Sequence, residues 1–224
     1  MRIGIIAALP REVSALVEGW ELRQLRGRVA VFTNGKAVVA CAGMGAVRAA
    51  LAVQAAMDTM AVTELISVGV AGGCDPALDV GAIVRAGVVV DARTGERFEN
   101  PQHEQVLVST DAIASVREKA RLHASYAADA VDMEAAAVGR LARANGLGFH
   151  AIKAISDKAD FELAGLGRFS DKEGYFREAA FALHVALRPV LWGKAAALGR
   201  NSSKAVDALT EALRGEIDWY RKNG

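Results

Sequence analysis

Two short apolar segments that each end in acidic residues constrain the fold of this chain more than any other feature. The first ends in the turn Asp132-Met133-Glu134, which opens an alanine-rich stretch with helical spacing. The second follows that stretch and ends at Ser156-Asp157. This order of strand, acid, helix, strand and acid predicts an α/β unit with carboxylates at the carboxyl ends of two strands. Ligands bind beyond such ends, so the pattern predicts a site with two carboxylates.

Apolar runs of strand length alternate with alanine-rich stretches along the rest of the chain. The runs are residues 2–8, 28–34, 36–42, 65–70, 82–91 and 105–109, and helical patterns occupy residues 46–60 and 171–223. The second helical pattern is broken at Pro189 and around residues 199–201, and Ser202-Ser203 can cap its last helix. Asn34-Gly35 separates two of the runs as a hairpin turn does. We predict one α/β domain over residues 1–224, a three-layer sandwich with a central mixed, mostly parallel sheet. Residues 91–103 are polar and predict a mobile loop.

Composition excludes several classes of partner. The net charge is +1, with acids and bases interspersed, so the chain has no electrostatic footprint for nucleic acid. No stretch approaches the roughly 20 apolar residues that span a bilayer, and the first residues predict a β-strand rather than a signal peptide. Cys41 and Cys74 show neither metal nor disulfide spacing. We therefore expect a cytoplasmic protein without a bound metal, and the four histidines are assigned no role.

Two further positions could carry chemistry. Glu12 follows Pro10 where a strand ends and a helix is predicted to begin, and it could serve either in catalysis or simply as a first-turn acid. Gly43 and Gly45 separate a strand from a helix, as in an anion-binding turn. The third glycine of the dinucleotide fingerprint is replaced by Arg48, which could contact an anion or remain solvated.

The order of the motifs resembles one family. The chain contains, in sequence, IGIIAALPREV, GVAGG with DVGAIV, LVSTDA, VDMEAAAV and AISDKAD. Together these segments resemble the purine nucleoside phosphorylase and nucleosidase superfamily, and within it the 5′-methylthioadenosine/S-adenosylhomocysteine nucleosidases. The resemblance covers about residues 1–160 and resumes at residues 201–214. It implies a nucleoside phosphorylase-like fold and cleavage of the N-glycosidic bond of a purine nucleoside, with water or inorganic phosphate as co-substrate and no cofactor.

The resemblance implies roles for three carboxylates. Glu134 would bind the ribose hydroxyls, Asp157 would protonate purine N7 as a neutral acid, and Glu12 would activate the attacking water. The residues placed around them by the motif match are Met133 beneath the ribose, Ser156 beside Asp157, and a purine-facing backbone at Leu107 to Ser109, Gly72 and Gly73.

Three positions depart from the nucleosidase pattern. Val70 stands where a serine is typical, Ile113 replaces an aromatic residue that stacks on the purine, and Lys153 replaces an arginine near the ribose. The chain is also shorter between residues 91 and 105, and it has an added helical segment at about residues 182–200. These features are similar to the hopanoid-associated branch of the superfamily, which implies phosphorolysis of an adenine nucleoside such as adenosylhopane.

Three readings stay open at this point. The first is hydrolysis of a methylthioadenosine-type nucleoside, and the second is phosphorolysis of a 5′-apolar nucleoside with Arg11 and Arg48 as anion contacts. The third is a nucleoside-binding protein with weak catalysis. The resemblance further implies a homo-oligomer, in which the added helical segment is an oligomer or core element or else touches a membrane surface peripherally.

Overall fold

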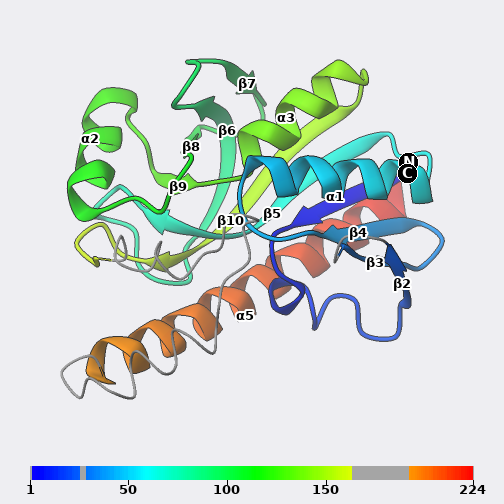
Figure 1. The fold of residues 1–224 in the computed structure, drawn as a ribbon, viewed down its shortest axis with the longest axis horizontal. Coiled ribbons are helices and arrows are strands. Elements are labelled where there is room, and N and C mark those ends of the chain that lie inside the picture. The colour runs from blue at the N-terminus through cyan, green and yellow to red at the C-terminus, as the bar shows by residue number, and fades with distance from the viewer. Residues whose placement is uncertain (1, 26–28, 163–191, 224) are drawn as a thin grey trace.

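In the part of the chain that the structure describes, ten strands form one sheet with helices on both faces (Figure 1). The computed structural model describes residues 2–25, 29–162 and 192–223. The strands are β1 (Ile3–Ala7), β2 (Glu21–Leu25), β3 (Val29–Thr33), β4 (Ala37–Cys41), β5 (Glu64–Gly73), β6 (Ile83–Asp91), β7 (Arg97–Glu99), β8 (Gln105–Ser109), β9 (Ala130–Asp132) and β10 (Gly148–Asp157). The helices are the short 3₁₀ helix η1 (Pro10–Glu12), α1 (Ala46–Thr59), α2 (Val116–Tyr126), α3 (Ala135–Ala144) and α5 (Trp192–Asn223).

The sheet closes on itself along part of its width. Its strand order is β10-β6-β8-β9-β5-β1-β4-β3-β2, and β10 also pairs with β5. Strands β5, β10, β6, β8 and β9 therefore form a closed ring, and β1, β4, β3 and β2 extend from it as an open flank. The prediction of an α/β fold with a central mixed sheet is confirmed, but a ring was not part of it.

The sheet contains more antiparallel pairing than the prediction of a mostly parallel sheet implies. Among the described strands, five pairings are parallel and five are antiparallel. One cause is the hairpin between β3 and β4, where Gly35 has a φ of 82°. The Asn34 side chain stabilises this turn by accepting hydrogen bonds from the backbone amides of Lys36 and Ala37. The other cause is ring closure, since β6 joins β10, and β9 joins β5, in antiparallel fashion.

Alanine-rich helices cover one face of the sheet and the last helix covers the other. In α1 the buried residues Ala49, Ala52, Val53 and Ala56 follow helical spacing and pack in one cluster with buried residues of β4 and α3. On the opposite face, α5 contributes Ala205, Leu209 and Leu213 to a cluster with β1 and β4. In Figure 1, α1 and α5 accordingly lie on opposite sides of the strands. Among the described residues, no helix combines the length and apolarity needed to cross a bilayer.

Helix α5 runs without interruption through Gly199, although the sequence pattern predicts a break at residues 199–201 with Ser202-Ser203 as a new cap. The buried positions Leu209 and Leu213 fix the helix on the sheet, and this packing outweighs the weak helix propensity of a glycine and an asparagine. Of the added helical segment at residues 182–200, the part from residue 192 is the start of α5. The rest lies outside the described residues.

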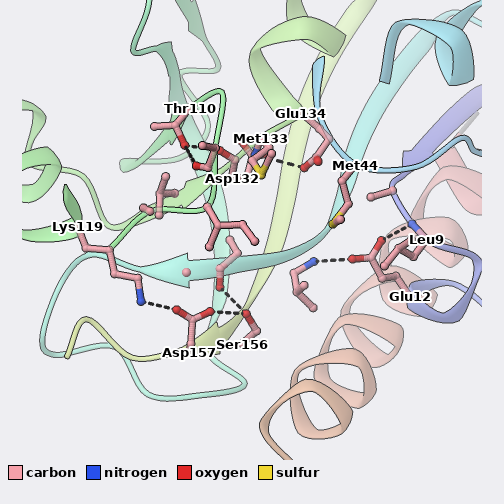
Figure 2. A pocket seen from close by; sticks show the side chains of 18 of the residues that line it. Leu9, Glu12, Met44, Thr110, Lys119, Asp132, Met133, Glu134, Ser156 and Asp157 are labelled. Carbon is pink, nitrogen blue, oxygen red and sulfur yellow. Dashed lines mark hydrogen bonds and ion pairs between the residues drawn. The ribbon is translucent and has the colours of Figure 1, made fainter. Parts of the chain in front are cut away.

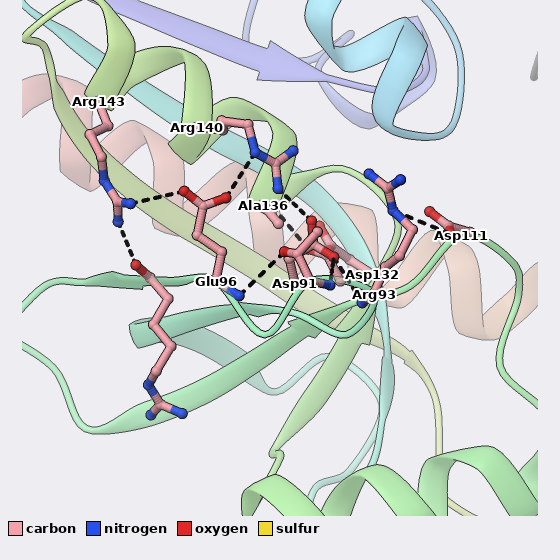
Figure 3. A network of polar contacts seen from close by, with 11 residues as sticks. Asp91, Arg93, Glu96, Asp111, Asp132, Ala136, Arg140 and Arg143 are labelled. Carbon is pink, nitrogen blue, oxygen red and sulfur yellow. Dashed lines mark hydrogen bonds and ion pairs between the residues drawn. The ribbon is translucent and has the colours of Figure 1, made fainter.

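The polar segment 91–103 is not an open loop. It forms a tight turn and strand β7, which pairs with β6. Two arginines of α3 hold the turn, as Figure 3 shows: Arg140 contacts the carboxylates of Asp91 and Glu96, and Arg143 contacts Glu96 at 2.9 Å. The prediction of a mobile loop missed these ion pairs because their acids and bases are more than 40 residues apart.

Candidate active site

A cavity of about 170 Å³ lies where β1, β5, β8, β9 and β10 end (Figure 2). It is lined by Ala8, Leu9, Arg11, Glu12, Met44, Val70, Ala71, Gly72, Thr110, Ala112, Ile113, Ala114, Lys119, Val131, Asp132, Met133, Glu134, Ser156 and Asp157. The acids that the sequence placed at strand ends thus meet in one place. Glu12 and Asp157 approach the cavity from opposite sides.

Most of the predicted site residues line this cavity. These are Arg11, Glu12, Val70, Gly72, Ile113, Met133, Glu134, Ser156 and Asp157. Gly73, Leu107, Ser109, Lys153 and Arg48 do not line it. The Leu107 side chain is fully buried in the core, so the predicted contact with the purine would involve its backbone alone. Across the described residues, no cluster of three His, Cys, Asp or Glu side chains could hold a metal ion.

Glu12 is fixed by backbone amides. The helix predicted after Pro10 is a single 3₁₀ turn, and it buries Glu12 to 4% exposure. The carboxylate accepts hydrogen bonds from the amide of Leu9 at 2.8 Å and from that of Val70 at 3.4 Å. Gly69 has a φ of 135°, and a Cβ there would stand 3.3 Å from a Glu12 oxygen. Burial raises the pKa of Glu12, which suits a group that must take up a proton.

Glu134 stands at the start of α3 and reaches toward the start of α1. One of its oxygens accepts a hydrogen bond from the amide of Gly45 at 2.7 Å. The predicted anion-binding turn therefore binds a carboxylate of the protein itself. Burial, and next the charge of Asp132, raise the pKa of Glu134 to about 7.

Behind Glu134 lies a buried ion pair that the sequence did not reveal as a unit. Lys153 Nζ is 2.9 Å from Asp132 Oδ2 and also donates to the carbonyl of Val68. Burial alone would lower the pKa of Lys153, but the carboxylates of Asp132 and Glu134 raise it above its usual value. Ser109 donates to the other Asp132 oxygen at 2.6 Å. Lys153 and Ser109 thus hold the turn that carries Glu134, and neither residue lines the cavity.

Asp157 occupies the far side of the cavity and is held by two side chains. Ser156 donates to one carboxylate oxygen at 2.7 Å, and Lys119 forms an ion pair with the other. The contact with Ser156 was predicted, but the ion pair with Lys119 was not. Lys119 comes from α2, which carried no motif, so nothing in the sequence connects it to Asp157. The cavity can thus present one buried acid, Glu12, to a nucleophile and an acid paired with an ammonium group, Asp157, to a leaving group.

Comparison with known proteins fits this geometry. The family model described as Phosphorylase superfamily matches residues 2–113 and 93–190. This chain belongs to the phosphorylase superfamily. The resemblance seen in its motifs is confirmed, and the motifs at residues 132–134 and 156–157 fall within the matched region.

Two curated relatives of this phosphorylase superfamily member are 5′-methylthioadenosine/S-adenosylhomocysteine nucleosidases, from Mycobacterium bovis (strain ATCC BAA-935 / AF2122/97) and Mycobacterium tuberculosis (strain CDC 1551 / Oshkosh). Each is 37% identical over 95 residues, which are 39% of this chain and 37% of the relative. The match therefore spans little more than a third of the length of these relatives.

Solved structures share the fold over nearly the whole chain. The 5′-methylthioadenosine/S-adenosylhomocysteine nucleosidase of Helicobacter pylori has a TM-score of 0.71 at 20% identity, covering 97% of this chain and 98% of its own. The futalosine hydrolase of Helicobacter pylori strain 26695 also has a TM-score of 0.71 at 20% identity, covering 97% of each chain. At this level of identity the likeness shows the fold alone.

Proposed function

We propose that this protein hydrolyses the N-glycosidic bond of a 5′-substituted adenine nucleoside of the methylthioadenosine/S-adenosylhomocysteine type and releases adenine. The observation that carries the proposal is the meeting of Glu12, Glu134 and Asp157 in one cavity. The partial match to mycobacterial nucleosidases supports the same reaction class.

The three carboxylates suit the three needs of this reaction. Cleavage passes through a ribosyl cation, so the sugar must be held, the leaving purine must be protonated and a nucleophile must be positioned. Glu134, with Met133 beside it, would accept hydrogen bonds from the ribose hydroxyls and stabilise the positive charge. Glu12 would take a proton from the attacking water. Asp157, with Ser156 beside it, would pass a proton to purine N7.

Two features favour water over phosphate as the nucleophile. Glu12 is a buried acid with a raised pKa in the cavity, which is what activation of water requires. The amide of Gly45 at the start of α1, where an anion could bind, instead donates to Glu134. A phosphate there would have to displace a carboxylate and then lie next to it, which electrostatic repulsion opposes.

A second candidate is phosphorolysis of a 5′-apolar adenine nucleoside such as adenosylhopane. Arg11 lines the cavity and could contact an anion, and the aliphatic side chains of Val70 and Ile113 give the wall an apolar character. Arg48, the other predicted anion contact, does not line the cavity, so this candidate rests on Arg11. A nucleoside-binding protein with weak catalysis is the remaining alternative.

The single-domain organisation, the cytoplasmic location and the homo-oligomer stay predictions.

The test measures adenine release from 5′-methylthioadenosine and from an adenosine with a long apolar 5′-chain, each with and without inorganic phosphate. We expect release from 5′-methylthioadenosine without phosphate, and a Glu12→Gln variant at least about 100-fold slower, since general base catalysis contributes about that much or more. Release from the apolar nucleoside alone, and only with phosphate, would replace hydrolysis by phosphorolysis. Binding without any release would indicate a binding protein.

A further inference from the structure

Lys119 carries its ammonium group at a buried position, where burying a charge is energetically unfavourable. Its side chain is 1% exposed, and it points from α2 toward Asp157 at the edge of the cavity (Figure 2). Taking an ammonium group out of water costs several kcal/mol unless it is paired and fully hydrogen bonded. A leucine or methionine of similar volume would avoid this cost, so packing alone does not account for the lysine.

All three acceptors of Lys119 belong to the last residue of β10 or to the segment that follows it. Besides the Asp157 carboxylate, its Nζ donates to the carbonyls of Lys158 at 2.8 Å and of Phe161 at 3.1 Å. The three N–H bonds of the ammonium group are therefore all satisfied. One of the bonds is made to the acid that the proposed reaction needs at the purine.

The surrounding backbone leaves room for this ion pair and holds it. A Cβ at Gly72 would stand 3.1 Å from Lys119 Cε and 3.2 Å from Asp157 Oδ2, so glycine allows both side chains to meet beside β5. Ser115 caps α2 by accepting from the amide of Glu118 at 3.2 Å. The pair is thus a built feature of the site.

We propose that Lys119 is a positioning residue that keeps a proton available to Asp157 for transfer to the departing purine. The inference rests on the proposed function. When the bond between C1′ and N9 breaks, its electrons pass to the purine, Lys119 passes a proton to the Asp157 carboxylate, and Asp157 passes a proton on to N7. Asp157 ends as a carboxylate and Lys119 as a neutral amine. The water that attacks C1′ gives its proton to Glu12, and exchange with solvent after product release returns a proton to Lys119.

The other titratable groups around the pair do not compete for this role. Burial, opposed by the charge of Lys119, raises the pKa of the Cys74 thiol to about 12, so the thiol keeps its proton. The remaining groups each have partners of their own: Asp129 accepts from the amide of Val106 at 2.7 Å, Glu118 pairs with Arg121 at 2.7 Å, and Lys158 pairs with Asp79 at 2.7 Å.

The test follows adenine release from 5′-methylthioadenosine over a range of pH for the parent and for Lys119→Met. We expect kcat to fall about 100-fold or more at about pH 8, because loss of proton delivery removes about that much, and KM to change less than about 3-fold. At about pH 5.5 the loss should shrink at least about 10-fold, because solvent then supplies more readily the proton that Lys119 no longer delivers. Lys36→Met, at an exposed hairpin position, should behave as the parent at both pH values.

Two further arms separate proton delivery from charge and from folding. Lys119→Arg keeps the positive charge but does not release its proton, so it should not restore the rate. Cleavage of 4-nitrophenyl β-D-ribofuranoside, whose leaving group needs no proton, should be within about 3-fold of the parent in Lys119→Met. If Lys119→Met does not fold, Lys119→Gln is measured in the same way, since its amide can still donate to Asp157.

The outcomes separate this inference from the proposed function. Equal losses at every pH, equal losses for both substrates, or full activity of Lys119→Arg would overturn proton delivery by Lys119 while leaving the hydrolase in place. No adenine release by the parent from any nucleoside would instead overturn the proposed function, and the inference with it.

Discussion

Replacing Glu134 by glutamine should make the protein more stable at alkaline pH while removing its activity. The pKa of Glu134 is raised from 4.5 to about 7, so between these values the unfolded chain has lost a proton that the folded protein keeps. Stability of the parent therefore falls as pH rises from about 4.5 to about 7. The full shift corresponds to about 3 kcal/mol. Since the carboxylate faces the cavity, solvent screening reduces the expected gain to about 1–2 kcal/mol.

Glutamine is a close match in shape, because its amide oxygen can still accept the hydrogen bond from the amide of Gly45. Urea unfolding of the parent and of Glu134→Gln at about pH 8 and about pH 4.5 measures the effect. The variant should be more stable at the higher pH and equal to the parent at the lower one. Glu18→Gln, an exposed position, is the matched control and should change neither value. A variant that is less stable at about pH 8, or shifted equally at both pH values, would refute the reasoning.

Three further substitutions test local packing and backbone conformation by urea unfolding. Ser67→Ala should leave stability unchanged or raise it by up to about 1 kcal/mol, because the Ser67 hydroxyl is buried without a hydrogen-bond partner among the described residues; a clear loss would reveal a missing partner. Gly69→Ala should lower stability by about 1–3 kcal/mol and lower activity, since its φ is 135° and the new Cβ would press on Glu12. Gly215→Ala, where an added Cβ meets nothing within 4 Å in α5, should instead raise stability by about 0.5–1 kcal/mol; a loss there would contradict the assumption that helix propensity decides.

The parts of the fold that the sequence predicted are those fixed by local pattern. Apolar runs gave the positions of β1, β4, β5, β6 and β10, and Asn34-Gly35 gave a hairpin because its turn geometry is a property of those two residues. The acids Glu134 and Asp157 line one cavity, since Asp157 ends β10, Glu134 lies two residues beyond β9, and the ends of these strands meet there.

The parts that were missed depend on contacts between distant segments. Ring closure requires β10 to pair with both β5 and β6, and no local pattern shows that a strand has two partners of different direction. Lys119 and Asp157 are 38 residues apart, and an amphipathic helix gives no sign of which of its basic residues will be buried. The interpretation of Lys153 as a residue beside the ribose missed its pairing with Asp132 for a related reason. Alternation along a strand gives two faces, but only packing decides which face meets the ligand.

The charges of the site explain why its acids differ. Four acids line the cavity, and two of them, Asp132 and Asp157, are paired with the buried lysines Lys153 and Lys119. Glu12 and Glu134 are held mainly by backbone amides, which satisfy oxygen atoms without supplying a full charge. Burial therefore raises the pKa of both. These two acids are the ones proposed to take up a proton and to face a cationic ribose. A carboxylate that is already paired with a lysine would perform these tasks less well.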